Sequence, residues 1–221
     1  MFVTVNGASI YYETRGTGSP MILIHGNSED HSIFDKLARK LEKDFSLYLP
    51  DSRNHGQSET TELYDYEIMA QDLEAFITRL GLSGADVLGF SDGAILALKV
   101  ALKRPELIGR MALLGPNLKP ADLTAEGRKL IEDLYEKTPT RLLKLVFEEP
   151  HIEAEELKRV KIPTLVAGGE NDIFSPETFQ TIADAIPNSE LEIVSGHDHV
   201  SYVVDSDFFH PRLKRFFKKK I

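Results

Sequence analysis

The alternation of strand-like and helix-like segments is the feature that most constrains the fold of this chain. Eight short runs are either continuously apolar or alternate apolar with polar residues, as strands do. Most of the later runs are separated by segments in which apolar residues recur with helical spacing. This rhythm predicts an α/β fold with a mostly parallel sheet and helices on both faces. The eight runs are 2–5, 9–15, 20–26, 45–51, 85–90, 108–115, 162–169 and 189–196.

The individual runs carry finer signals. The first two flank Asn6-Gly7, a pair suited to a two-residue hairpin turn because both turn positions need positive φ. The run PMILIHG (20–26) is apolar throughout, as in a central strand buried on both faces. Helices are expected at about 30–43, 66–81, 92–104, 176–186 and 211–219.

One segment breaks the rhythm. Between 115 and 162 the chain has no strand pattern and reads as two or three helices. A long insertion on an α/β sheet often covers the functional site. Because 221 residues suit one domain, we predict a single domain over 1–221 with a small helical cap at about 117–150. We expect the last helix of the segment to cover the sheet.

Composition narrows the class of protein. The net charge of −9 disfavours nucleic acid and gives no attraction to an anionic membrane. The basic end RLKRFFKKKI is read as a solvated helix face. The chain has no cysteine, no signal-peptide pattern and no apolar run of membrane-spanning length. We therefore expect a cytoplasmic protein.

The stretch VLGFSDGAIL (87–96) places Ser91 between Gly89 and Gly93 in a G-x-S-x-G pattern. A strand precedes it and an apolar helix follows, which is the setting of a nucleophile elbow. In so tight a turn a Cβ on either flank would clash, which explains the two glycines. The Ser91 hydroxyl would then stand at the end of the sheet, above a helix N-terminus that favours negative charge.

Four stretches together resemble the α/β-hydrolase family, and the resemblance runs nearly end to end. LIHGNSEDHSIF resembles its oxyanion strand, LPDSRNHGQSE its D-x-R-x-x-G-x-S loop with Asn54 in place of glycine, and GFSDGA its elbow. GGENDIFSP and VSGHDHV lie where the family carries its acid and histidine, in the order serine, acid, histidine. At the elbow, FSDG also resembles the biphenyl-hydrolase-like branch, whose substrates include amino-acid esters.

The resemblance implies a catalytic triad, and the chemistry of each role suggests which residue fills it. Ser91 needs a base to take its proton. We expect that base to be His197, directly after Gly196 at a predicted strand end, with His199 as the rival. We expect Asp172 to orient the imidazole, with Glu170 as the rival acid.

The oxyanion donors follow from the same resemblance. They would be the backbone N–H of Asp92, the residue after the nucleophile, and that of Asn27, after His25-Gly26. His25 and His55 are read as structural. His31, His151 and His210 belong to no motif and are expected at the surface or in the cap.

The side chain of Asp92 has two interpretations. A carboxylate in the first turn of a helix is stabilised by the helix dipole by about 0.3–1 kcal/mol. Alternatively, Asp92 points into the acyl pocket and selects substrates with a positive group, because a desolvated carboxylate left unpaired is costly.

These features favour a serine hydrolase that cleaves small-molecule carboxylic esters through an acyl-enzyme. A carbon–carbon bond hydrolase using the same triad is an alternative, as are a small-molecule receptor on a hydrolase scaffold and an interaction protein with a vestigial site. No cofactor is required, and the short GHDH stretch is a weak metal motif. Monomer and homodimer are both compatible with the sequence.

Overall fold

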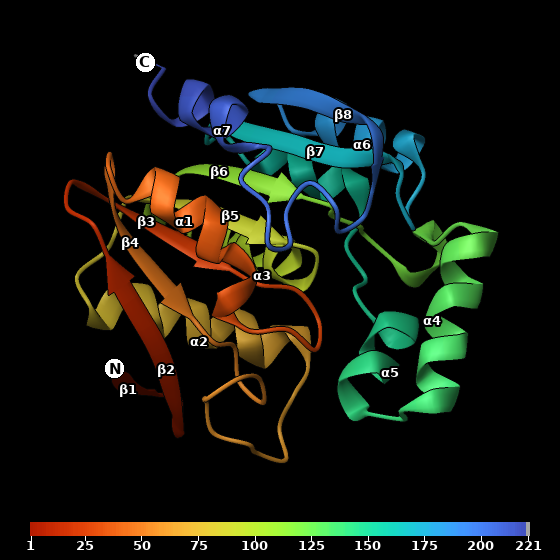
Figure 1. Cartoon of the computed structure of the whole chain (residues 1–221), viewed down its shortest axis with the longest axis horizontal. Helices are drawn as coiled ribbons and strands as arrows, with labels where there is room; N and C mark the ends of the chain where they lie inside the picture. The colour runs from red at the N-terminus through yellow and green to blue at the C-terminus, as the bar shows by residue number, and fades with distance from the viewer. Residues whose placement is uncertain (220–221) are drawn as a thin grey trace.

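An eight-stranded sheet runs through the centre of the molecule (Figure 1). The structure is a computed structural model and describes residues 1–219. The sheet order is β1-β2-β4-β3-β5-β6-β7-β8; the β1–β2 and β2–β4 pairs are antiparallel and the other pairs are parallel. The predicted α/β architecture is confirmed. The strands are β1 (Phe2–Val5), β2 (Ala8–Arg15), β3 (Ser19–Ile24), β4 (Phe45–Pro50), β5 (Ala85–Phe90), β6 (Ile108–Leu114), β7 (Thr164–Asn171) and β8 (Ser189–Asp198).

The first turn of the chain forms as its sequence predicts. Asn6 and Gly7 join β1 to β2 with φ values of 44° and 75°. Both are in the left-handed region that a two-residue hairpin turn requires.

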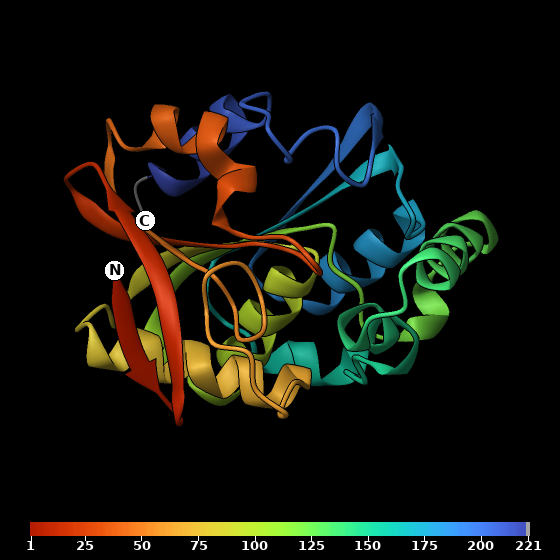
Figure 2. The ribbon, with the colours of Figure 1, turned by 60° about the horizontal axis from the view of Figure 1, so that its bottom comes forward.

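Helices cover both faces of the sheet (Figure 2). α1 and α7 lie on one face, and α2, α3 and α6 lie on the other. These helices are α1 (Asp35–Leu41), α2 (Tyr66–Arg79), α3 (Asp92–Lys103), α6 (Pro176–Ala185) and α7 (His210–Phe217), and a 3-10 turn, η1 (His31–Phe34), precedes α1.

Strand β3 shows why its run is apolar throughout. Met21 and Leu23 belong to the core under α1 and α7, whereas Ile22 and Ile24 belong to the core under the other helices. All four are at most 1% exposed. A central strand with period-2 side chains must therefore be apolar at every position.

Two helices, α4 (Ala125–Lys137) and α5 (Arg141–Glu148), stand apart from those that cover the sheet (Figure 1). They lie off the edge toward which β5 and β6 point, with Tyr135 of α4 and Phe147 of α5 in edge contact at 6.2 Å. The following 3-10 turn, η4 (Ala154–Arg159), buries Leu157 in the core beneath the sheet. We call α4 and α5 the cap helices; their separate role stays a prediction.

Within residues 1–219, no helix is both long and apolar enough to cross a lipid bilayer.

Candidate active site

Ser91 occupies the sharp turn between β5 and α3. Its φ of 51° and ψ of −115° are unusual for a residue with a side chain. Asp92 begins α3 directly afterwards. The turn therefore places the Ser91 side chain at the carboxyl edge of the sheet, beside the N-terminus of a buried helix.

The two flanking glycines are required by packing. A Cβ on Gly89 would overlap the backbone of Gly93, and a Cβ on Gly93 would overlap the carbonyl of Ile24 in β3. Neither glycine has a positive φ. Their role is to let β5, α3 and β3 approach closely, and this close approach sets the position of Ser91.

The histidine that reaches Ser91 is His199. Its Nε2 is 3.1 Å from Ser91 Oγ, and its Nδ1 is 2.7 Å from Asp172 Oδ1. Since Nδ1 faces a carboxylate, that nitrogen holds the proton and donates a hydrogen bond to Asp172. Nε2 is then free to accept the hydrogen of the Ser91 hydroxyl. The three side chains form a hydrogen-bonded chain from Ser91 through His199 to Asp172.

The expectation that His197 would face Ser91 is wrong. The Nδ1 of His197 lies 3.0 Å from Ser201 Oγ, and its ring packs against Phe208 at 4.4 Å between centroids. The rival residue, His199, holds the place that we expected for His197.

The pairing of β7 with β8 gives the reason. We expected the last strand to end at Gly196, but β8 continues to Asp198. The register of the β7–β8 pair shifts beyond Gly169, so that Asn171 of β7 pairs with Asp198 of β8. The next residues along the two strands are Asp172 and His199, which leave the sheet side by side.

Asp172 is well placed to orient an imidazole. Its side chain is fully buried, and it accepts backbone hydrogen bonds from Gly169 and Phe174, each at 3.2 Å. The rival acid Glu170 is exposed and accepts hydrogen bonds from Ser195 Oγ and the Gly196 N–H instead. The geometry therefore favours Asp172 as the acid.

The imidazole of His199 is held by its neighbours. Phe90 and Phe174 pack against the ring, with centroids 5.0 and 5.7 Å away. A Cβ on Gly115, which has a φ of +61°, would lie 2.7 Å from His199 Cε1. The end of β6 therefore needs a glycine to leave room for the histidine.

A cavity of about 530 Å³ opens over Ser91 and His199. The cap helices supply much of its apolar wall, with Ile131 from α4 and Val146 from α5. Leu130 and Leu134 line it while remaining 51% and 43% exposed, which places them toward its mouth. A cavity of this size fits a small organic molecule.

Asn27 and Asp92, the two expected oxyanion donors, lie together in this cavity wall. As the first residue of α3, Asp92 has a backbone N–H with no helical carbonyl to bind. The residue is 6% exposed, and its carboxylate accepts hydrogen bonds from Tyr66 Oη at 2.7 Å and Asn27 Nδ2 at 2.9 Å. Burial raises the pKa of the Asp92 carboxyl.

Sequence reasoning missed Glu29, a second carboxyl group in the cavity wall. Its Oε2 accepts a hydrogen bond from the Gly26 N–H at 3.0 Å. A Cβ on Gly26 would lie 2.7 Å from that oxygen and 3.1 Å from Ser91 Cβ, so Glu29 lies close to Ser91. Burial raises the pKa of Glu29 to about 7.

The histidines of the neighbouring loops make backbone contacts. His25 Nδ1 donates to the Gly26 carbonyl and its Nε2 accepts from the Ser52 N–H, while His55 Nδ1 donates to the Arg53 carbonyl. Burial lowers the pKa of His25 to about 4. The rings shape the loops around the site, as the sequence predicts.

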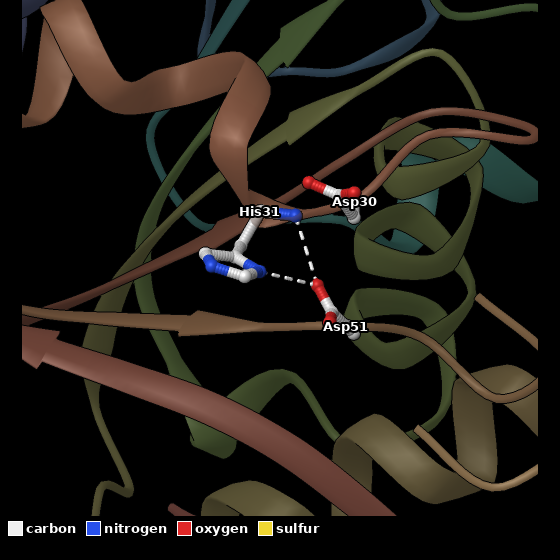
Figure 3. Close-up of side chains that lie close together, drawn as sticks. All are labelled: Asp30, His31 and Asp51. Atoms are coloured by element: carbon white, nitrogen blue, oxygen red, sulfur yellow. Dashed lines mark hydrogen bonds and ion pairs between the residues drawn. The ribbon is translucent and has the colours of Figure 1, made fainter. Parts of the chain in front are cut away.

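One cluster has donor types that could hold a metal ion, and Figure 3 shows its three side chains: Asp30, His31 and Asp51. Asp51 Oδ1 accepts hydrogen bonds from the backbone N–H and Nδ1 of His31, and Asp51 Oδ2 accepts one from the Gln57 N–H. Asp30 Oδ1 accepts from the Ser32 N–H and caps η1. These bonds explain the cluster as loop structure. His31 is buried, contrary to the expected surface position.

The fold and the site define the class of protein. Residues 19–150 match the family model described as the alpha/beta hydrolase fold, and the chain belongs to the α/β-hydrolase family.

Three known proteins illustrate the likeness. The chain is 28% identical to Lipase 1 of Psychrobacter immobilis over 96% of this chain and 81% of that protein. It is 25% identical to the AB hydrolase superfamily protein YisY of Bacillus subtilis over 96% and 97% of the two chains. A solved meta-cleavage product hydrolase superposes with a TM-score of 0.84 and 20% identity, covering 100% of this chain and 98% of the other. Other relatives are named as an epoxide hydrolase and a chloroperoxidase.

Proposed function

We propose that this protein is a serine hydrolase that cleaves small-molecule carboxylic esters through an acyl-enzyme intermediate. The proposal rests on two hydrogen bonds. One joins Ser91 Oγ to His199 Nε2 at 3.1 Å, and the other joins His199 Nδ1 to Asp172 Oδ1 at 2.7 Å. His199 takes the Ser91 proton, and the oxygen attacks the acyl carbon. Protonated His199 then donates to the leaving alcohol, and later activates the water that releases the acid.

The negative oxygen of the tetrahedral intermediate needs preorganised donors. The backbone N–H groups of Asn27 and Asp92 are our candidates, because both residues line the cavity around Ser91. The dipole of α3, which begins at Asp92, favours negative charge at the same place.

The identity of the nucleophile argues for ester chemistry among the activities of the relatives. Members of this family that open epoxides or cleave carbon–halogen bonds carry aspartate at the elbow position. This chain has Ser91 there. The likeness to a lipase over 96% of the chain points the same way. Carbon–carbon bond hydrolysis uses the same kind of triad, and the solved relative with that activity supports the fold alone.

The position of Asp92 suggests which substrates the enzyme prefers. Its buried carboxylate lines the cavity, and both of its hydrogen-bond donors, Tyr66 Oη and Asn27 Nδ2, are neutral. A substrate with an amino group near the acyl carbon would supply the positive partner that these donors do not. We therefore propose esters of amino acids as preferred substrates.

A matched pair of activated esters, alanyl and propionyl, tests both parts. Wild type should cleave at least one, and Ser91→Ala should lose three or more orders of magnitude in kcat/KM. A preference for the alanyl ester supports the role of Asp92. Equal rates for both esters contradict that role, and equal rates for wild type and Ser91→Ala contradict the hydrolase mechanism.

A further inference from the structure

The side chain of Asn27 joins three parts of the active site. Its Nδ2 donates to Asp92 Oδ2 at 2.9 Å and to the carbonyl of Leu142, in the first turn of cap helix α5, at 2.8 Å. Its Oδ1 accepts the Ser28 hydroxyl at 2.8 Å. One amide therefore spans the loop after β3, the start of α3 and the cap.

The C-terminal end of α5 is also connected to Asp92, through Tyr66. Glu149 follows the helix, and its Oε2 accepts the Tyr66 N–H at 3.1 Å. The hydroxyl of Tyr66 donates to Asp92 Oδ1. Both ends of α5 are thus connected to the Asp92 carboxylate, one through Asn27 and the other through Tyr66.

The Asp92 and Tyr66 ends of these contacts are shielded from water, whereas the bonds from Asn27 to Leu142 and from Tyr66 to Glu149 are part-buried. Asp92 is 6% exposed and Tyr66 is 1% exposed. Hydrogen bonds to buried groups are costly to leave unmade, so displacing α5 would free donors and acceptors that the closed arrangement satisfies. By contrast, the ion pair between Arg141 of α5 and Glu62 is largely exposed and contributes little.

We propose that the side chain of Asn27 has a positioning role and couples the placement of cap helix α5 to the oxyanion hole. This inference rests on the proposed function, in which the backbone N–H of Asn27 binds the oxyanion. With α5 in place, the Leu142 carbonyl and the Asp92 carboxylate together fix the amide and so the backbone that carries it. When α5 moves away, the anchor at the Leu142 carbonyl is lost, and the loop after β3 that carries Asn27 is free to shift.

The coupling also gives the cap a chemical role. α5 contributes Leu143 and Val146 to the cavity wall, so a substrate that packs against them favours the closed position. Substrate contacts distant from the reacting carbonyl would thereby help to form the oxyanion hole.

The test uses Asn27→Ala and Glu149→Ala, which release α5 from the network at opposite ends. Each should lower kcat by about 10-fold to 100-fold and change KM by a smaller factor, because the oxyanion donor is displaced while α5 stays held by the bond at its other end. Amide hydrogen exchange over 141–148 should accelerate in both variants. The double variant should lose no more activity than the worse single variant, since both act on one coupling.

Glu148→Ala is the matched control. Glu148 pairs with Lys144 on the same helix and is half exposed, so kcat and exchange over 141–148 should match wild type. Glu149→Ala changes no residue of the loop that carries Asn27, so it keeps the test valid if Asn27→Ala does not fold.

Two results would overturn the coupling. One is a loss of kcat in Asn27→Ala with wild-type exchange over 141–148, and the other is additive losses in the double variant. A wild type that cleaves no ester would contradict the proposed function instead, and the exchange measurement separates that failure from failure of the coupling.

Discussion

His199 Nε2 lies 3.1 Å from Ser91 Oγ, although the two residues are 108 positions apart in the chain. The elbow after β5 and the register of β7 against β8 bring them together. The elbow can be predicted from the sequence, whereas the register of β7 against β8 cannot. The sequence therefore predicts the turn at Ser91 correctly but favours His197 instead of His199 as the residue that faces it.

Asp172→Asn tests the role of the acid. The amide keeps the shape of the side chain but removes the charge that holds the Nδ1 proton of His199. We expect kcat for an activated ester to fall by about 10³-fold to 10⁴-fold with little change in KM. Steady-state kinetics measure this, with Glu170→Gln as the control because Glu170 bonds only Ser195 and Gly196 among the described residues. A larger loss in Glu170→Gln would make Glu170 the acid.

Asp92→Asn tests the substrate preference. The alanyl-over-propionyl ratio of kcat/KM should fall by about tenfold or more, because the amide offers no charge to the substrate amino group. The propionyl rate should change less than the alanyl rate. An unchanged ratio would show that Asp92 serves only the hydrogen-bond network of Tyr66 and Asn27.

Gly93→Ala tests the packing that positions the nucleophile. Alanine inside a helix ordinarily stabilises it by about 1 kcal/mol relative to glycine. Here the added Cβ overlaps the carbonyl of Ile24, so we expect a net loss of about 3 kcal/mol in the free energy of unfolding. Urea denaturation measures it. Wild-type stability would show that β3 and α3 can separate without cost.

Glu29→Gln tests the buried carboxyl beside Ser91. Burial raises the pKa of Glu29 from 4.5 to about 7, so between these values the folded protein keeps a proton that the unfolded chain has lost. The stabilisation is complete below pH 4.5 and disappears as the pH rises through 7. The stability of wild type relative to Glu29→Gln should therefore fall by roughly 2 kcal/mol between pH 5 and pH 8, allowing for partial exposure.

Urea midpoints of both proteins across this range make the comparison. The difference between the two proteins cancels groups that titrate in both, such as His25 and Asp86. A difference that stays constant with pH would contradict a raised pKa for Glu29.

The sequence predicts the frame of the molecule well. Local requirements of backbone and packing restrict the residue types at several places, so the sequence reveals them. Examples are the hairpin at Asn6-Gly7, the apolar strand β3 and the glycines around Ser91. The eight strands and the mostly parallel character of the sheet are likewise predicted from the alternation of strand and helix patterns.

The site depends on relationships that no local pattern records. The choice of His199 over His197 depends on the register shift beyond Gly169, which pairs Asn171 with Asp198. The nearness of Glu29 to Ser91 and the bond from Asn27 to Leu142 arise from tertiary packing across long separations. The need for glycine at position 115 follows from the imidazole of His199 beside it, which no local sequence pattern reveals.

Covalent labelling of Ser91 tests the central claim most directly. Wild type, His199→Ala and His197→Ala would each be treated with a fluorophosphonate, and the adduct located by peptide mass spectrometry. We predict an adduct on Ser91 in wild type and in His197→Ala at similar rates, and a rate at least 10²-fold lower in His199→Ala, which lacks the base. Rapid labelling of Ser91 in His199→Ala, or its loss in His197→Ala, would contradict the triad of Ser91, His199 and Asp172.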